Sequence, residues 1–208
     1  MATHARLNGL GCGHARRALL TALVCALVGA RIEAGSERLL DLQRSVVTIR
    51  LGSEGILSRF APDIRIEAPL GEGAVDESIP HMQVVFEAAQ LRVLGDGLTA
   101  ADRAAIQSRM TGPEVLDIAE HPWIHYHSVT IERTSTGWLI HGELDLHGTI
   151  LPLQALMRRE GDRYVGSATA RLSEFGIAPV RRWGGLVKVR DDVTVEFDVL
   201  LAQTARSP

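Results

Sequence analysis

Hydrophobic and polar residues alternate along three neighbouring segments between residues 121 and 157. This period of two is typical of half-buried antiparallel strands, because successive side chains of a strand point to opposite faces. In the middle segment Leu144 and Leu146 share one face, and Glu143, Asp145 and His147 share the other. Charged side chains stay in water, so we predict that the leucine face points inward.

Two turns join these segments into a predicted meander. Residues 134–137 and the corner His147-Gly148-Thr149 are rich in residues that favour tight turns. In the third segment the apolar face consists of Leu151, Leu153, Ala155 and Met157. A three-stranded meander leaves open edges, so we expect further strands to cover them.

The rest of the chain adds strands and one predicted helix. The last strand has the clearest alternation, with Val193, Val195, Phe197, Val199 and Leu201 on one face. The helix is expected to begin at the N-cap Thr99 and to end before Gly112-Pro113. About eight strands without a β-α-β rhythm favour an all-β fold, an eight-stranded antiparallel barrel with one helix inserted mid-chain.

The interior of such a barrel is either filled by side chains or open to one small ligand. Small residues on the inner face leave a volume that something else must fill, and an elongated apolar ligand suits it. The small inward candidates are Gly142 and Ala155, with either Gly166, Ala168 and Ala170 or Ser167 and Thr169.

The first thirty residues predict an export signal. They carry three arginines and no acid, followed by an apolar run over residues 18–27 and small residues at 28–30. The apolar run is too short to cross a bilayer, which needs about 20 residues. We expect residues 1–30 to be a signal peptide and residues 31–208 to be one domain of a periplasmic or secreted protein. A buried N-terminal helix is the alternative.

The expected loss of this leader changes the chemistry of the chain. Both cysteines, Cys12 and Cys25, lie in it, so the mature chain has no disulfide, catalytic thiol or cysteine metal ligand. Three of the 22 basic residues and none of the 25 acidic residues are lost, which leaves a net charge of about −6. No basic patch with interleaved aromatic residues is present, and we exclude nucleic acid as a partner.

Five short motifs follow one another between residues 113 and 202. They are Val115-Leu116-Asp117 before His121-Pro122; Ile124-x-Tyr126-x-Ser128; Gly142-Glu143-Leu144-x-Leu146-His147-Gly148 with Pro152; Phe175-Gly176-Ile177; and Val189-x-Asp191-x-Val193. As an ordered set they resemble the YceI-like family of polyisoprenoid-binding, lipocalin-like proteins. The N-terminal half matches less well, because residues 49–51 and 58–64 lack a histidine and a glycine that family members often carry there.

The resemblance implies an exported lipocalin-like barrel that binds, carries or stores an isoprenoid lipid, such as a polyprenyl lipid or an isoprenoid quinone. It implies neither catalysis nor a cofactor, and no Gly-x-Ser-x-Gly nucleophile motif is present. The expected partner is an isoprenoid or other lipophilic small molecule; transient membrane contact and a homodimer stay open. The expected wall of the apolar pocket is Tyr126, Ile140, Leu144, Leu151, Leu153, Phe197 and Val199.

Basic and aromatic residues in a long connection suggest a site for the ligand's head group. Arg181 and Arg182 could receive an anionic group such as a pyrophosphate, and the neighbouring Trp183 could contact the ligand. Solubilising loop charges are the alternative interpretation.

The histidines suggest a second hypothesis, a zinc-dependent hydrolase. If the turn at residues 134–137 pairs residue 127 with residue 145, four residues of metal-binding type share one face: His125, His127, Asp145 and His147. A His-x-His strand with a third ligand opposite can hold zinc. The same register places this face in water beside Glu143, so we expect a solvated polar face and no metal. A third hypothesis is a ligand-free barrel that binds a partner through its surface.

Overall fold

The computed structural model describes residues 37–54, 63–76, 81–95, 97–179, 181–182 and 187–203, without the side chains of residues 181, 182, 187 and 188. These residues belong to one compact unit, Ala34–Pro208. The expected signal peptide, residues 55–62 and Trp183 lie outside the described residues.

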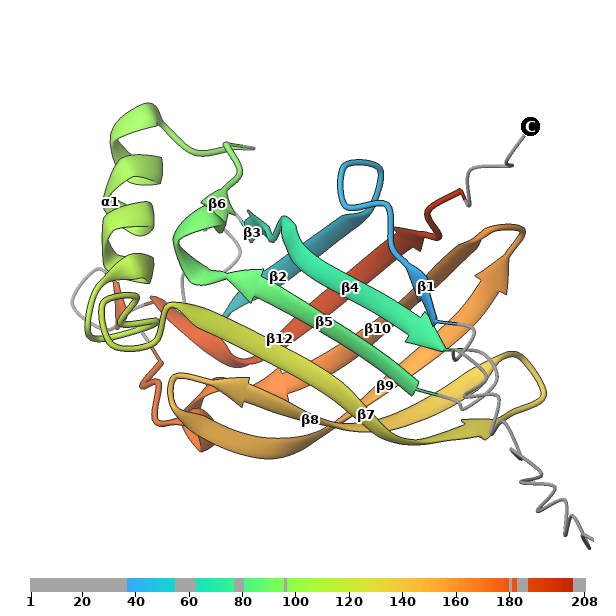
Figure 1. Ribbon diagram of the computed structural model, residues 1–208. Coiled ribbons are helices and arrows are strands. Elements are labelled where there is room, and N and C mark those ends of the chain that lie inside the picture. The colour runs from blue at the N-terminus through green and yellow to red at the C-terminus, as the bar shows by residue number, and fades with distance from the viewer. Residues whose placement is uncertain are drawn as a thin grey trace, which may run out of the picture. The chain divides into compact units, whose positions relative to one another are not determined.

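The described residues form twelve β-strands in one antiparallel sheet (Figure 1). Its order is β1-β4-β5-β7-β8-β9-β10-β12-β2-β3-β6, and β11 pairs with β12 beside this path. The strands are β1 (Glu37–Leu39), β2 (Val46–Glu54), β3 (Ile64–Glu67), β4 (Leu70–Asp76), β5 (His81–Glu87), β6 (Arg92–Val93), β7 (Trp123–Arg133), β8 (Trp138–Leu146), β9 (Thr149–Glu160), β10 (Arg163–Arg171), β11 (Arg181–Arg182) and β12 (Val187–Leu200).

The predicted all-β antiparallel class with one inserted α-helix is confirmed, but the predicted number of eight strands is wrong. Eight of the described strands have seven or more residues, and β1, β3, β6 and β11 have only two to four. The strands β1 and β11 are too short to show an alternation, and glycines at positions 71 and 73 interrupt the apolar pattern of β4, so the sequence pattern does not reveal these three strands. Two further short segments, Ala88–Gln90 (η2) and Leu172–Phe175 (η3), are 3-10 helices.

The sheet is a strongly curled half-barrel. Residues 40 and 41, just after β1, connect strands that are far apart in its order. Leu40 forms an isolated bridge with Leu201. The Leu40 amide also donates to the Gly73 carbonyl at 2.9 Å, and the Asp41 amide donates to the Leu200 carbonyl at 2.7 Å. These bonds connect the β4 side of the sheet to the end of β12, so the sheet encloses an interior.

The predicted meander is present as β7, β8 and β9, with the predicted inner face. Ile140 is fully buried and Leu146 is 8% exposed, whereas Glu143 and Asp145 on the opposite face are partly exposed. On β9, Ala155 is buried while its neighbours Gln154 and Leu156 are exposed. The alternation therefore gave the correct inside and outside of this part of the sheet.

The helix α1 (Ala100–Thr111) follows the predicted boundaries. The side chain of Thr99 accepts a hydrogen bond from the Asp102 amide at 3.1 Å, which satisfies one of the free donors of the first turn. Gly112 is the C-cap. Figure 1 shows α1 at one end of the curled sheet. Among the helices that the structure describes, none is both long and apolar enough to cross a membrane.

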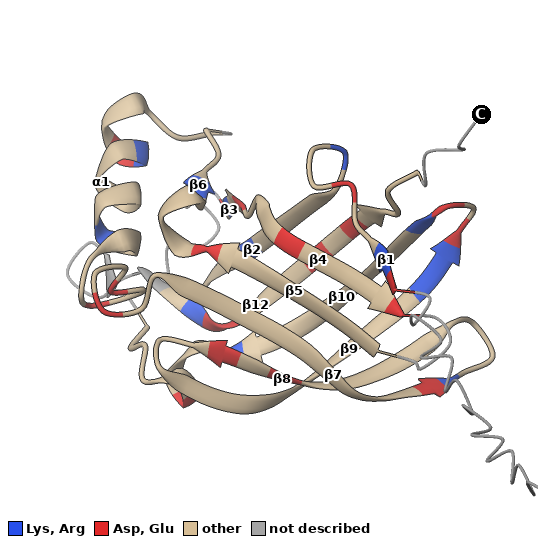
Figure 2. Ribbon diagram, in the orientation of Figure 1, with Lys and Arg blue, Asp and Glu red and all other residues tan. Residues whose placement is uncertain are grey.

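One side chain of α1 holds the edge strand β6. Gln107 accepts a hydrogen bond from the Val93 amide and donates one to the Leu91 carbonyl, each at 2.8 Å. The helix therefore pairs backbone groups at the end of the sheet path, where an open edge would expose them. Acidic and basic residues are interspersed over the described strands (Figure 2).

Candidate functional site: an apolar cavity inside the curled sheet

A cavity of about 360 Å³ lies within the curled sheet. Side chains from nine strands and from α1 line it, and nearly all of them are apolar. On β2, for example, Val47, Ile49 and Leu51 line the cavity, while the intervening Thr48 and Arg50 do not. The alternation that builds the strands therefore also gives the cavity its apolar wall.

Many inward-facing apolar side chains are only partly buried. Protein interiors are normally close-packed, so an inward apolar side chain that remains accessible borders an unfilled space. The partly buried side chains that line the cavity include Ile49, Leu51, Val84, Phe86, Leu144, Leu153, Val195 and Phe197. These side chains give the described part of the wall an accessible apolar surface.

The ring of Tyr126 lies on the inner wall above Gly142. A Cβ atom at residue 142 would lie 2.5 Å from the Tyr126 Cζ atom and 2.5 Å from the His127 carbonyl oxygen. A larger residue at this position would therefore displace the ring. The glycine allows the aromatic ring to lie close to the backbone of β8.

Tyr126 also places one hydroxyl group in the apolar lining. The hydroxyl donates to the Leu153 carbonyl at 3.4 Å, and burial raises the pKa of Tyr126 to about 12. The phenol is therefore neutral at physiological pH. A phenol oxygen can accept a hydrogen bond as well as donate one.

Charged residues line the cavity at the end near α1. Asp102 and Arg109 come from α1, and Arg190 comes from the first part of β12. Arg109 forms an ion pair with Glu114 at 2.7 Å. The exposed side chains of Arg109 and Arg190 place this end of the cavity beside solvent.

Five of the seven predicted pocket residues line the cavity: Tyr126, Leu144, Leu153, Phe197 and Val199. Ile140 and Leu151 do not. Ile140 lies opposite Ala155 and is 0% exposed, so it belongs to a filled part of the core. Leu151 lies opposite Leu144 and packs against the core. That the five lining residues contact a ligand stays a prediction.

Much of the cavity wall was not assigned from the sequence. The inward faces of β2 and β5 are recognisable as alternating apolar residues, but nothing in the pattern shows that they border empty space. The wall residues from these two strands and α1 are Val47, Ile49, Leu51, Met82, Val84, Phe86, Asp102, Ala105, Ile106, Arg109 and Met110.

The predicted head-group residues are only partly described. Arg181 and Arg182 form β11, where they pair with Lys188 and Val187. Their side chains are not described, and Trp183 lies outside the described residues. A head-group role for these three residues therefore stays a prediction.

Three of the four residues predicted to share one strand face do so on the outer face of the sheet, namely His125, His127 and Asp145, but His147 does not join them and the predicted pairing of residue 127 with residue 145 is wrong. His125 lies opposite Asp145, but His127 lies opposite Glu143 and pairs with it, with 3.4 Å between Nε2 and Oε2. Both histidines are exposed on the outer face. A bulge in β7 between Ser128 and Thr130 contributes to this change of register, and His147 lies beyond the residues of β8 that pair with β7. The structure therefore does not support the zinc-hydrolase hypothesis.

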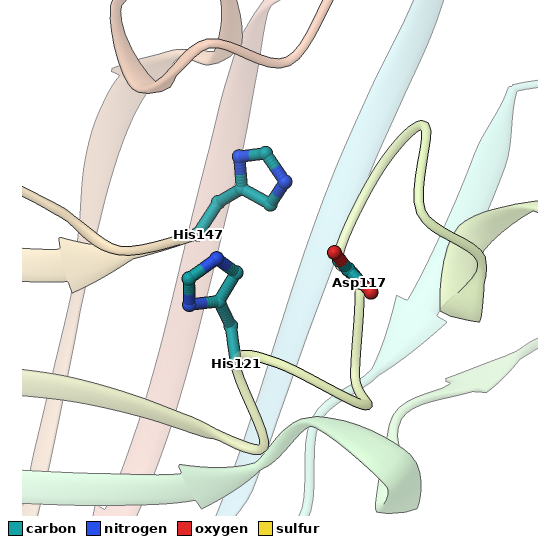
Figure 3. Close-up of side chains that lie close together, drawn as sticks. All are labelled: Asp117, His121 and His147. Carbon is teal, nitrogen blue, oxygen red and sulfur yellow. The ribbon is translucent and has the colours of Figure 1, made fainter.

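A different group of metal-binding side chains is present. In the described part of the chain, Asp117, His121 and His147 offer ligand atoms that all lie within 4.8 Å of one another (Figure 3). The rings of His121 and His147 are 5.0 Å apart between centroids. The metal ligands considered from the sequence include His147 but neither Asp117 nor His121.

Comparison with known proteins identifies the family of this fold. The model of the YceI-like domain matches residues 42–201. No curated protein matches the chain. Among solved structures, BcnA of Burkholderia cenocepacia is similar to this chain, with 16% sequence identity and a TM-score of 0.54; the match covers 79% of this chain and 99% of BcnA.

The YCEI protein of Campylobacter jejuni is also similar, with 12% identity and a TM-score of 0.45 over 67% of this chain and 82% of that protein. The family match extends from the loop before β2 to the end of β12 and thus includes every strand of the cavity wall. The chain belongs to the YceI-like domain family.

Proposed function

We propose that this protein binds an elongated lipophilic molecule of the isoprenoid class in the cavity and catalyses no reaction on it. The observation that carries the proposal is the apolar wall whose inward side chains remain partly accessible. The volume of about 360 Å³ falls in the range of about 300–1,000 Å³ that is common for small-molecule sites. Members of the YceI-like family bind polyisoprenoids and other lipids, which supports this ligand class.

The hydrophobic effect supplies enough free energy for such binding. Removing about 300 Å² of apolar ligand surface from water gains about 7.5 kcal/mol at about 25 cal/mol per Å², before the cost of association is subtracted. A flexible prenyl chain loses conformational freedom on binding, so a wall that is already formed favours affinity. The neutral Tyr126 hydroxyl would contact an oxygen of the ligand.

Two leucines of β9 provide a matched test of this proposal. Leu153 lines the cavity, whereas Leu156 is 61% exposed on the other face of the same strand. Leu153→Arg places a charge in the cavity and is expected to abolish binding of a fluorescent prenyl-chain probe. Leu156→Arg is expected to bind the probe as the unmodified protein does.

A third variant separates lost binding from lost folding. Ala168 is buried and lines the cavity, so Ala168→Leu fills part of the space with apolar atoms and adds no charge. We expect a folded protein, by circular dichroism and thermal unfolding, with probe affinity reduced at least tenfold. Unchanged affinity in folded Leu153→Arg and Ala168→Leu would contradict the proposal and favour a ligand-free, partner-binding barrel.

The proposal includes export of the protein to the periplasm or the outside of the cell. Its support is the arginine-containing leader with an apolar run at residues 18–27. Amino-terminal sequencing of protein from the periplasmic fraction is expected to show a new terminus near Ala30. Retention of the full leader in a cytoplasmic fraction would contradict export, without affecting the ligand proposal.

A further inference from the structure

We propose that Asp117, His121 and His147 form a binding site for a divalent transition-metal ion, for which Zn²⁺ is the probe. The site uses none of the cavity-lining side chains, so the inference goes beyond the proposed lipid binding and does not depend on it. The first support is proximity, because one ligand atom from each side chain lies within 4.8 Å of the other two.

The types of ligand suit zinc. Zn²⁺ binds histidine nitrogen and carboxylate oxygen at about 2.0–2.2 Å, and two histidines with one carboxylate leave a fourth position for water. Tetrahedral geometry at these bond lengths separates ligand atoms by about 3.3–3.6 Å. The three ligand atoms therefore need to approach one another by at most about 1.5 Å, which rotation of partly buried side chains can provide. A hard cation such as Mg²⁺ prefers oxygen ligands and is a poor match.

The hydrogen bond of His147 leaves its Nε2 atom free to bind a metal ion. Its Nδ1 lies 3.2 Å from the Phe175 carbonyl oxygen. A carbonyl can only accept, so Nδ1 carries the proton and Nε2 has a free lone pair. Histidine ligands of metals are held in this way by a second hydrogen bond. In Figure 3 a ring nitrogen of His147 lies on the side that faces Asp117.

The backbone brings the three residues together from two parts of the chain. The His121 amide donates to the Asp117 carbonyl at 2.8 Å, a tight turn that places the two side chains near each other. Asp117 and His147 have φ values of 45° and 54°, and no other non-glycine residue in the described ranges has a positive φ. The left-handed conformation at His147 ends the alternation of β8 and turns the side chain toward His121.

Gly148 leaves space for the ring of His121. A Cβ atom at this position would lie 2.6 Å from the His121 Cε1 atom. A bound ion would therefore connect the loop between α1 and β7 to the corner between β8 and β9. The neighbours Leu116 and Leu146 line the cavity, so this connection would fix two segments of the cavity wall.

The test measures zinc binding to protein expressed from the full-length sequence without a histidine tag. After exposure to Zn²⁺ and dialysis, we expect one zinc ion per chain by elemental analysis. We also expect a rise in Tm with Zn²⁺ that the same concentration of Mg²⁺ does not give, since a ligand that binds only the folded state stabilises it.

Conservative variants assign the ligands. Asp117→Asn keeps the shape and tolerates a positive φ, and His121→Phe keeps a ring beside Gly148. Each is expected to fold and to weaken zinc binding at least tenfold. His127→Ala on the outer face is the control and is expected to bind zinc normally. Substoichiometric zinc in the unmodified protein, undiminished binding in both cluster variants, or loss of zinc in His127→Ala would overturn the proposal.

Discussion

The ring of Phe197 on β12 lies directly over Gly166 on β10. The two residues are cross-strand partners, and a Cβ atom at residue 166 would lie 2.5 Å from the Phe197 Cζ atom. That atom would also clash with the Leu156 carbonyl oxygen. A glycine is therefore required where the phenylalanine lies against the sheet, the same arrangement as Tyr126 over Gly142.

This contact predicts the cost of adding one methyl group. Gly166→Ala forces the ring and the backbone of β9 to shift, so we expect a loss of about 1–3 kcal/mol in the free energy of unfolding. Urea denaturation measures it. The adjacent Ser167→Ala is the control, with an expected change within about 0.5 kcal/mol. Equal stability of the two variants would show that the inner wall has more room than the structure indicates.

The two hydrogen bonds that Gln107 of α1 makes with the backbone at residues 91 and 93 predict a local loss of protection from hydrogen exchange when Gln107 is replaced. Gln107→Ala leaves the Val93 amide and the Leu91 carbonyl without their side-chain partner, at an expected cost of about 1–3 kcal/mol. Hydrogen exchange of the Val93 amide is expected to accelerate, while amides of β8 keep their protection. Ser108→Ala, an exposed neighbour on the same helix, is the control. An unchanged exchange rate of the Val93 amide in Gln107→Ala would contradict a stabilising role of these two hydrogen bonds.

The burial of Tyr126 predicts a pH dependence in the alkaline range. The pKa of Tyr126 is raised to about 12, while a tyrosine of the unfolded chain titrates near about 10. The stability that comes from the neutral phenol is therefore fully present below about pH 10 and is lost as the pH rises toward 12. Tyr164→Phe leaves Tyr126 as the remaining tyrosine of the chain.

In Tyr164→Phe, absorbance of the tyrosinate ion is expected to develop near pH 12 in the folded protein and near pH 10 in denaturant. A midpoint near pH 10 in the folded state would show that the hydroxyl is accessible to bulk water. Bound ligand, by excluding water further, is expected to raise the midpoint.

The sequence predicted the inner and outer faces of the meander because a period of two leaves no alternative once one face is charged. Leu144 and Leu146 point inward for this reason. The sequence could not predict the short strands β1 and β11. Nor could it predict that Ile140 fills the core while Leu144 borders a cavity, because both residues are apolar and inward. That distinction depends on the curvature of the whole sheet.

The group of Asp117, His121 and His147 was missed for a different reason. The predicted register paired residue 127 with residue 145, whereas a bulge between Ser128 and Thr130 contributes to a pairing of His125 with Asp145. The contact also depends on the left-handed backbone at His147. Neither feature leaves a periodic signal, although the corner His147-Gly148 does mark the turn.

Native mass spectrometry of the protein, purified without detergent and followed by solvent extraction, tests lipid binding most directly. The account predicts a bound species of several hundred daltons that extracts as a prenyl lipid and is absent from Leu153→Arg but present in Leu156→Arg. A bare protein mass, with a fluorescent prenyl-chain probe also failing to bind, would contradict the account.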